Sequence, residues 1–159
     1  MVSLMPDETI DLLNQLVKVN KDAEAGFLTA AQNIQNSELE TLFTKNATQH
    51  GKMAGELQTE IERLGGTYSD SGTVGGALHR GWLDLKSTLS GHSASAILSS
   101  CESGEESAEA AYARATDAHP SGQTNALVEK HYRQIQQFRT HLCRLIGETK
   151  DGVDFQKNK

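Results

Sequence analysis

The sequence has few residues that break helices or cross-link a chain. Only two prolines, Pro6 and Pro120, occur in 159 residues, and the 14 glycines gather in a few short segments. Long, uninterrupted helices are therefore favoured, because proline and glycine are the two residues that helix interiors tolerate least. The two cysteines, Cys101 and Cys143, show no CxxC or zinc-like spacing, so we expect free thiols in a reducing cytoplasm.

Several function classes are disfavoured by other absences. No segment approaches the ~20 consecutive apolar residues of a membrane-spanning helix, and the N-terminus lacks the basic and long apolar regions of a secretory signal. The formal charge is −6, with no run of basic residues, so the chain should repel a nucleic-acid backbone. We expect a cytoplasmic protein that binds neither nucleic acid nor membranes.

What the sequence does contain is a helical pattern. Hydrophobic residues make up 36% of the chain, and in four segments they recur every three or four positions, as on one face of a helix. No segment shows the alternating pattern of a strand. The predicted helices cover residues 7–36, 37–64, 93 to the break at "DAHPSG", and that break to Gly147.

The boundaries of these helices carry local signals. Ser37 and Glu40 have the spacing of a capping box at the start of the second helix. Gly65 and Gly66 are suited to end that helix, because glycine adopts the left-handed conformation of a helix C-terminus. Gly147 is the expected end of the fourth helix.

The connections between the helices predict the fold. Two are short and make helical hairpins, whereas the connection from about residue 65 to 91 is long and contains a short helix, "ALHRGWLDLKSTL". His79, Arg80 and Trp82 should anchor this crossover. The expected architecture is an all-α, ferritin-like four-helix bundle, with one domain at residues 7–147 and a polar tail at residues 148–159.

Polar residues interrupt the apolar seams near the middle of the predicted bundle. Counting ~1.5 Å of rise per residue from the two hairpin turns places one carboxylate and one imidazole of each hairpin at a similar depth. These residues are Glu24 and His50 in the first hairpin and Glu105 and His131 in the second, with Asn20, Asn46 and Glu102 as supporting polar residues.

Three interpretations of these residues are open. They form a hydrogen-bonded network that fixes helix register, or a divalent metal site with Glu24, His50, Glu105 and His131 as ligands, or they face solvent because the seam is misassigned. A di-iron centre would need two Glu-x-x-His pairs, but Ala47 and Val128 stand three residues before the two histidines. At most half of that ligand set is present.

Several motifs together resemble a known family. The succession "LNQL…KDAEAGF", "ELQTEIERLGG", "GTVGGALHRGWLDLK", "ILSSCESGEESAEAAYARA" and "LVEKHYRQI" is similar to a bacterial family of uncharacterised four-helix-bundle proteins within the ferritin-like superfamily. The similarity extends over about residues 8–146. It implies a ferritin-like bundle, and relatives in the superfamily suggest a role in stress response.

Two functions follow as alternatives. The first is a non-enzymatic bundle protein, related to stress response, that binds an ion, a small ligand or a partner. The second is a metal-binding oxidase or storage protein for iron, manganese or zinc, with the Glu/His site in the bundle core. Whether the protein is an enzyme stays open, as does self-association into a homodimer through its polar helix faces.

Overall fold

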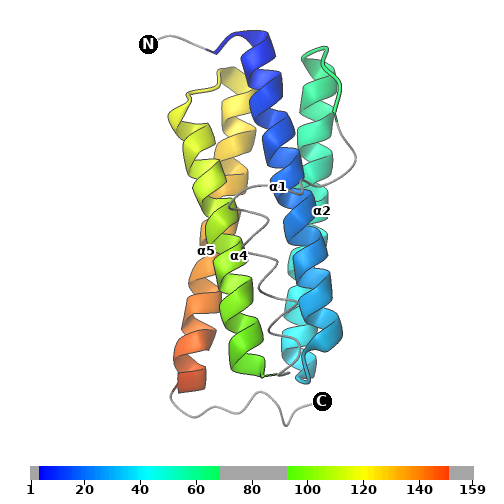
Figure 1. Ribbon diagram of the computed structural model, residues 1–159. Coiled ribbons are helices and arrows are strands. Elements are labelled where there is room, and N and C mark those ends of the chain that lie inside the picture. The colour runs from blue at the N-terminus through cyan, green and yellow to red at the C-terminus, as the bar shows by residue number, and fades with distance from the viewer. Residues whose placement is uncertain (1–3, 69–92, 151–159) are drawn as a thin grey trace.

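The chain folds into a bundle of long helices (Figure 1). The computed structural model describes residues 4–68 and 93–150. Within these ranges there are four helices and no strands, which confirms the prediction of an all-α chain. The helices are α1 (Pro6–Asn33), α2 (Ser37–Arg63), α4 (Ala94–Asp117) and α5 (Gly122–Lys150).

The start of α2 differs by one residue from the prediction. Asn36, and not Ser37, is the N-cap, because its side-chain oxygen accepts a hydrogen bond from the Leu39 N–H at 2.9 Å. Both residue types suit this position. α1 itself ends at Asn33, three residues before the predicted end.

The glycine signals had different outcomes. Gly65 has a φ of 82° directly after the C-cap of α2, which confirms the predicted end of that helix. Gly147 was wrong as the end of the fourth helix, since α5 continues to Lys150. A glycine inside a helix costs only about 1 kcal/mol relative to alanine, so it ends a helix only where the chain also turns.

The four helices form two antiparallel hairpins, α1 with α2 and α4 with α5 (Figure 1). α1 packs closely on α4, whereas the backbones of α2 and α5 approach each other closely at few positions. α2 ends and α4 begins at opposite ends of the bundle, so these two helices run in the same direction. The predicted crossover helix with His79, Arg80 and Trp82 lies outside the described residues.

The apolar core consists of two clusters along the bundle axis. One contains Phe27, Phe43 and Ile97, and the other contains Leu13 and Leu57. On α1, α2 and α4 the two clusters are separated by buried polar residues, so the interior has a polar layer between two apolar layers. Most buried polar groups in proteins have hydrogen-bond partners, so the side chains of this polar layer should bond to one another.

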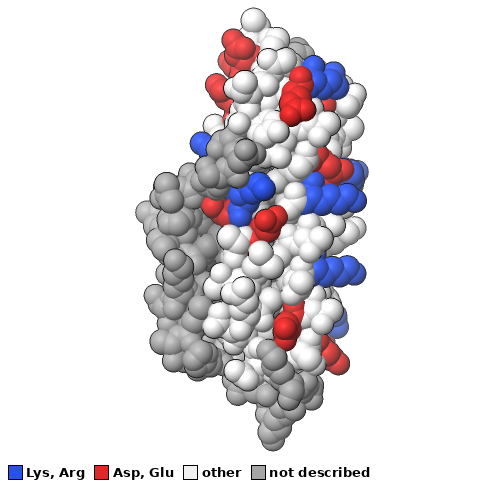
Figure 2. Space-filling view, turned by 90° about the vertical axis from the view of Figure 1, so that its right-hand side faces the viewer, with Lys and Arg blue, Asp and Glu red and all other residues white. Residues whose placement is uncertain are grey.

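The surface in Figure 2 carries both signs of charge. On this face, Lys and Arg side chains alternate with Asp and Glu side chains over the described residues, with uncharged surface between them. None of the four helices is both long and apolar enough to cross a membrane, as far as the described residues go.

Candidate functional site

Asn20, His50 and Glu105 form the centre of the polar layer. All three have an exposed fraction of 0%, and they come from α1, α2 and α4. His50 Nδ1 lies 2.7 Å from Asn20 Oδ1, and His50 Nε2 lies 2.8 Å from Glu105 Oε1. Asn46, one helical turn before His50, donates from Nδ2 to Glu105 Oε2 at 2.8 Å.

The donor and acceptor chemistry fixes the His50 ring. An amide oxygen only accepts hydrogen bonds, so His50 Nδ1 carries a proton and donates it to Asn20 Oδ1. One further proton lies between His50 Nε2 and Glu105 Oε1. Both carboxylate oxygens of Glu105 therefore have a partner, as a buried carboxyl group requires.

A second branch leads from Asn20 toward α5. Asn20 Nδ2 donates one hydrogen to the Leu16 carbonyl oxygen and the other to the Tyr112 hydroxyl, each at 2.8 Å. The Tyr112 hydroxyl proton is then free to be donated to His131 Nδ1, 3.0 Å away. Burial raises the pKa of Tyr112, which keeps this hydroxyl protonated.

The branch ends at Glu56 on the edge of the bundle. His131 Nδ1 accepts from Tyr112, so the neutral ring carries its proton on Nε2 and donates it to Glu56 Oε1 at 3.0 Å. Burial lowers the pKa of His131 despite the opposing effect of Glu56. Lys130 donates to the other oxygen of Glu56 at 3.0 Å. Burial of Glu56 raises its pKa, but its bonds to Lys130 and His131 outweigh this and leave the pKa lowered.

Seven side chains are joined in one continuous series of hydrogen bonds, which we call the core network. It crosses all four helices. Glu56, whose side chain is 29% exposed, lies at one end, and Asn46, which is 6% exposed, lies at the other. In order, the members are Glu56, His131, Tyr112, Asn20, His50, Glu105 and Asn46.

The four residues predicted as metal ligands do not meet at one point. His50 and Glu105 are in contact, but His131 is connected to them only through Tyr112 and Asn20. Glu24 is half-buried over Gly51 of α2, where its carboxylate fills the space that a Cβ on Gly51 would need. Over residues 4–68 and 93–150, no three His, Cys, Asp or Glu side chains are placed to hold a metal ion. These residues do not fit a di-metal centre.

Glu102, predicted to support the core, lies on a different face of α4. It accepts from Arg139 Nε at 2.9 Å, and the same guanidinium donates to Glu109 at 3.0 Å. These ion pairs connect α4 with α5 at the surface, outside the core network. Cys101 is buried and Cys143 is exposed, and both are free thiols.

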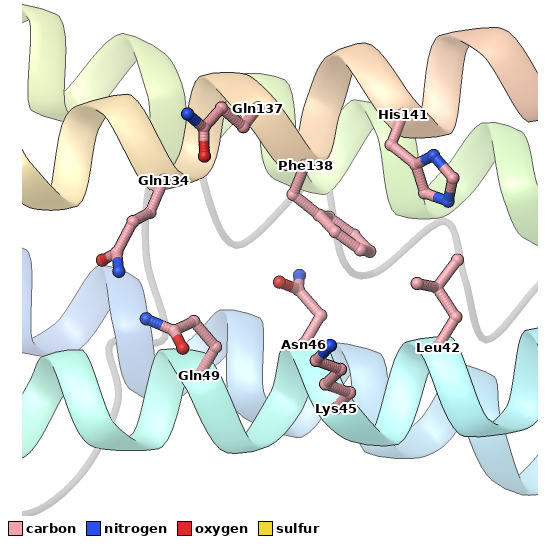
Figure 3. A pocket seen from close by; sticks show the side chains of 8 residues that line it. All are labelled: Leu42, Lys45, Asn46, Gln49, Gln134, Gln137, Phe138 and His141. Atoms are coloured by element: carbon pink, nitrogen blue, oxygen red, sulfur yellow. The ribbon is translucent and has the colours of Figure 1, made fainter.

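The widest seam of the bundle, between α2 and α5, contains a pocket. One half of this seam is bridged by polar contacts, in which Glu56 bonds to Lys130 and His131 and the buried Glu60 bonds to Thr124. The other half opens into a cavity of about 330 Å³, which we call the α2–α5 pocket (Figure 3). Its lining residues are Leu42, Lys45, Asn46, Gln49, Gln134, Gln137, Phe138 and His141.

Side chains from both helices point into this space. Figure 3 shows Asn46 extending from α2 toward Phe138 of α5, while Gln134 extends from α5 toward α2. Gln134 Oε1 is buried and has no hydrogen-bond partner. Asn46 is shared by the pocket and the core network, because it lines the pocket and donates to Glu105.

Comparison with known proteins gives the family. A family model described as a domain of unknown function, DUF2383, matches residues 8–118. The chain belongs to the DUF2383 family. The matched segment of this DUF2383 chain contains six of the seven members of the core network, and only His131 lies beyond it. A search of curated proteins found no match.

Two members of the core network in this DUF2383 protein are missing from the sequence-based set of site residues. Tyr112 recurs at the spacing of the apolar residues of its helix, and its ring does pack in an apolar cluster. A phenol in a buried seam is itself a signal, because its hydroxyl needs a partner. Glu56 gives no comparable signal, because nothing in its spacing distinguishes it from the surface glutamates around it.

Proposed function

We propose that this protein is a ferritin-like bundle that binds a small molecule in the α2–α5 pocket and that it is not an enzyme. The parallel course of α2 and α4 supports the ferritin-like connectivity. The observation that carries the binding function is the pocket itself, which is placed over the core network through Asn46. Pockets for small molecules start at ~300 Å³, and this one has about 330 Å³.

The lining of the pocket suits ligand recognition. Four of the eight lining residues that the structure describes are carboxamides, each of which offers donors and an acceptor. One acceptor, Gln134 Oε1, has no hydrogen-bond partner among the residues that the structure describes. A buried acceptor without a partner costs ~1–3 kcal/mol, so a ligand that donates to it gains affinity.

A binding role fits the core network better than catalysis does. His50 and Glu105 have the chemistry of an acid–base pair, but both are 0% exposed and neither lines the pocket. A general acid or base must come within hydrogen-bond reach of its substrate. In this fold the pair instead holds Asn46 in position, and Asn46 in turn forms part of the pocket lining.

The test is a pair of tryptophan substitutions at neighbouring positions of α5. Gln137 lines the pocket, whereas Gln136 is exposed and does not. Ligand-observed NMR with a fragment library should give hits on the wild-type chain and on Gln136→Trp, and these hits should be lost on Gln137→Trp. Equal hits on both variants, or no hits on the wild type, would contradict the proposal.

A metal function is the competing candidate, and it is supported only by the contact between His50 and Glu105. Metal analysis of protein purified without chelator separates the two functions. A binding protein of the proposed kind should contain substoichiometric metal, unchanged in Glu24→Ala. A stoichiometric metal that is lost in Glu24→Ala and in His50→Ala would favour the metal site and argue against our proposal.

A further inference from the structure

We infer that the α2–α5 pocket selects a small aromatic organic anion, with a carboxylate at one end of the ring and a hydroxyl or N–H donor at the other. This inference rests on the proposed binding function and specifies the ligand class. It follows from the charge, the aromatic wall and the free acceptor of the pocket.

The charge of the pocket is opposite to that of the protein. The formal charge of the chain is −6, yet none of the lining residues that the structure describes is acidic, and Lys45 supplies a positive charge. Lys45 is exposed and forms no ion pair with a described residue. An ammonium group at an acid-free pocket favours an anion, because a charge-assisted hydrogen bond is stronger than a neutral one.

His141 supplies a second donor at the end of the pocket near Leu42, while Lys45 lies beside Asn46 between this end and Gln134 (Figure 3). Arg144 can only donate, and its Nη2 lies 2.7 Å from His141 Nδ1, so the neutral ring carries its proton on Nε2. Burial and the charge of Arg144 lower the pKa of His141, which keeps the ring neutral near pH 7. The Nε2–H is thus a donor for a carboxylate oxygen.

The wall between the two ends of the pocket is aromatic and packs against the apolar core. The Phe138 ring contacts Phe27 edge-on, with the centroids 5.5 Å apart and an interplanar angle of 81°. Phe138 points into the gap between the helices (Figure 3), with Leu42 on the α2 side. A planar ring packs well on such a wall, because aromatic pairs add ~0.5–1.5 kcal/mol beyond the burial of area.

The far end of the pocket has the opposite polarity to the His141 end. Gln134 Oε1, the buried acceptor without a partner, lies two helical turns before His141 on α5. At ~1.5 Å per residue, these seven residues separate the two ends by about 10 Å. One six-membered ring with a substituent at each end fits this distance when a hydrogen bond extends from both substituents.

The experiment uses 4-hydroxybenzoate as the probe and 4-hydroxybenzyl alcohol as its neutral counterpart, with binding measured by titration calorimetry. The variant is Lys45→Met, which removes the charge and keeps the side-chain stem. Lys52→Met on the same helix is the matched control, since Lys52 is exposed and does not line the pocket. Both lysines are on the surface, so both variants should fold.

We expect 4-hydroxybenzoate to bind the wild type and Lys52→Met equally and Lys45→Met about tenfold more weakly, the effect of losing one charged hydrogen bond. The alcohol should bind the wild type about tenfold more weakly than the acid for the same reason. If acid and alcohol bind equally and Lys45→Met changes nothing, the anion inference is wrong while the pocket still binds ligands. If neither probe binds at millimolar concentration, the anion inference is wrong, and the fragment hits then decide the binding function separately.

Discussion

Glu105 is the residue at which the role of the core network can be measured most directly. In Glu105→Leu, His50 Nε2 and Asn46 Nδ2 both lose their partner inside the bundle, and each group that is stranded in this way costs ~1–3 kcal/mol. The leucine recovers a part of this as buried apolar surface. The expected loss in the free energy of unfolding is about 2–4 kcal/mol, which is large against a typical total of ~5–15 kcal/mol.

Glu105→Gln should behave very differently. His50 Nδ1 carries a proton for Asn20, so Nε2 of the neutral ring can accept a hydrogen bond from the new amide nitrogen. The amide oxygen takes the place of Glu105 Oε2 and accepts from Asn46. Every group then has a partner, and we expect a change in the free energy of unfolding of less than about 1 kcal/mol.

Urea unfolding followed by circular dichroism measures both variants, with Glu106→Gln as the control on the exposed side of α4. The control should change the stability by less than about 0.5 kcal/mol. If Glu105→Gln is as costly as Glu105→Leu, the stabilising feature is the charge of the carboxylate and not its hydrogen-bond geometry. The reasoning about the core network would then be refuted.

Two further predictions concern the branch toward α5. Tyr112→Phe should lower the free energy of unfolding by about 2–4 kcal/mol, because Asn20 loses an acceptor and His131 loses a donor. Tyr132→Phe is the control. Equal losses of both variants in urea unfolding would contradict the role of the Tyr112 hydroxyl in the core network. The lowered pKa of His131 means that the unfolded chain, with a histidine pKa near 6.5, binds the proton first as the pH falls. The contribution of neutral His131 to the free energy of unfolding should therefore be fully present above about pH 6.5 and decrease below it. His131→Gln should reduce the dependence of the free energy of unfolding on pH between about pH 7 and about pH 5. Because the pKa of His141 is also lowered, the comparison belongs in a His141→Gln background, where an unchanged slope would argue against a buried neutral His131.

The sequence predicts the helices and the depth of the polar layer well. Periodicity identifies amphipathic helices without further information, and counting from the hairpin turns places Glu24 with His50 and Glu105 with His131 at similar depths. Glu24 does lie against Gly51, the residue after His50, and His50 does contact Glu105. A helix has a constant rise per residue, so depth can be counted from sequence alone.

The face of a helix on which a residue lies is harder to predict than its depth along the bundle, as Glu24 illustrates. The three–four spacing in α1 is compatible with a seam from Asn20 through Glu24 to Phe27, but the buried face passes through Ala23, which is 0% exposed. Positions three and four residues onward are both compatible with a 3.6-residue turn. A small alanine gives little hydrophobic signal to decide between them.

The α2–α5 pocket could not have been predicted from the sequence. Its two walls lie about 90 residues apart along the chain, and glutamine and asparagine are ordinary residues on helix surfaces. The pocket exists because α2 and α5 are further apart than the other neighbouring helices. That spacing depends on side-chain packing across the whole bundle, which no local pattern records.

Phe27 connects the pocket wall with the buried imidazole. Its ring lies stacked on His50, with the centroids 5.8 Å apart and an interplanar angle of 12°, and it also forms a T-shaped contact with Phe138. An occupant that displaces Phe138 will tilt Phe27 and change the ring current felt by the His50 carbon-bound protons. The chemical shifts of the buried His50 ring protons should therefore report ligand binding in the pocket, although Phe27 lies between His50 and Phe138.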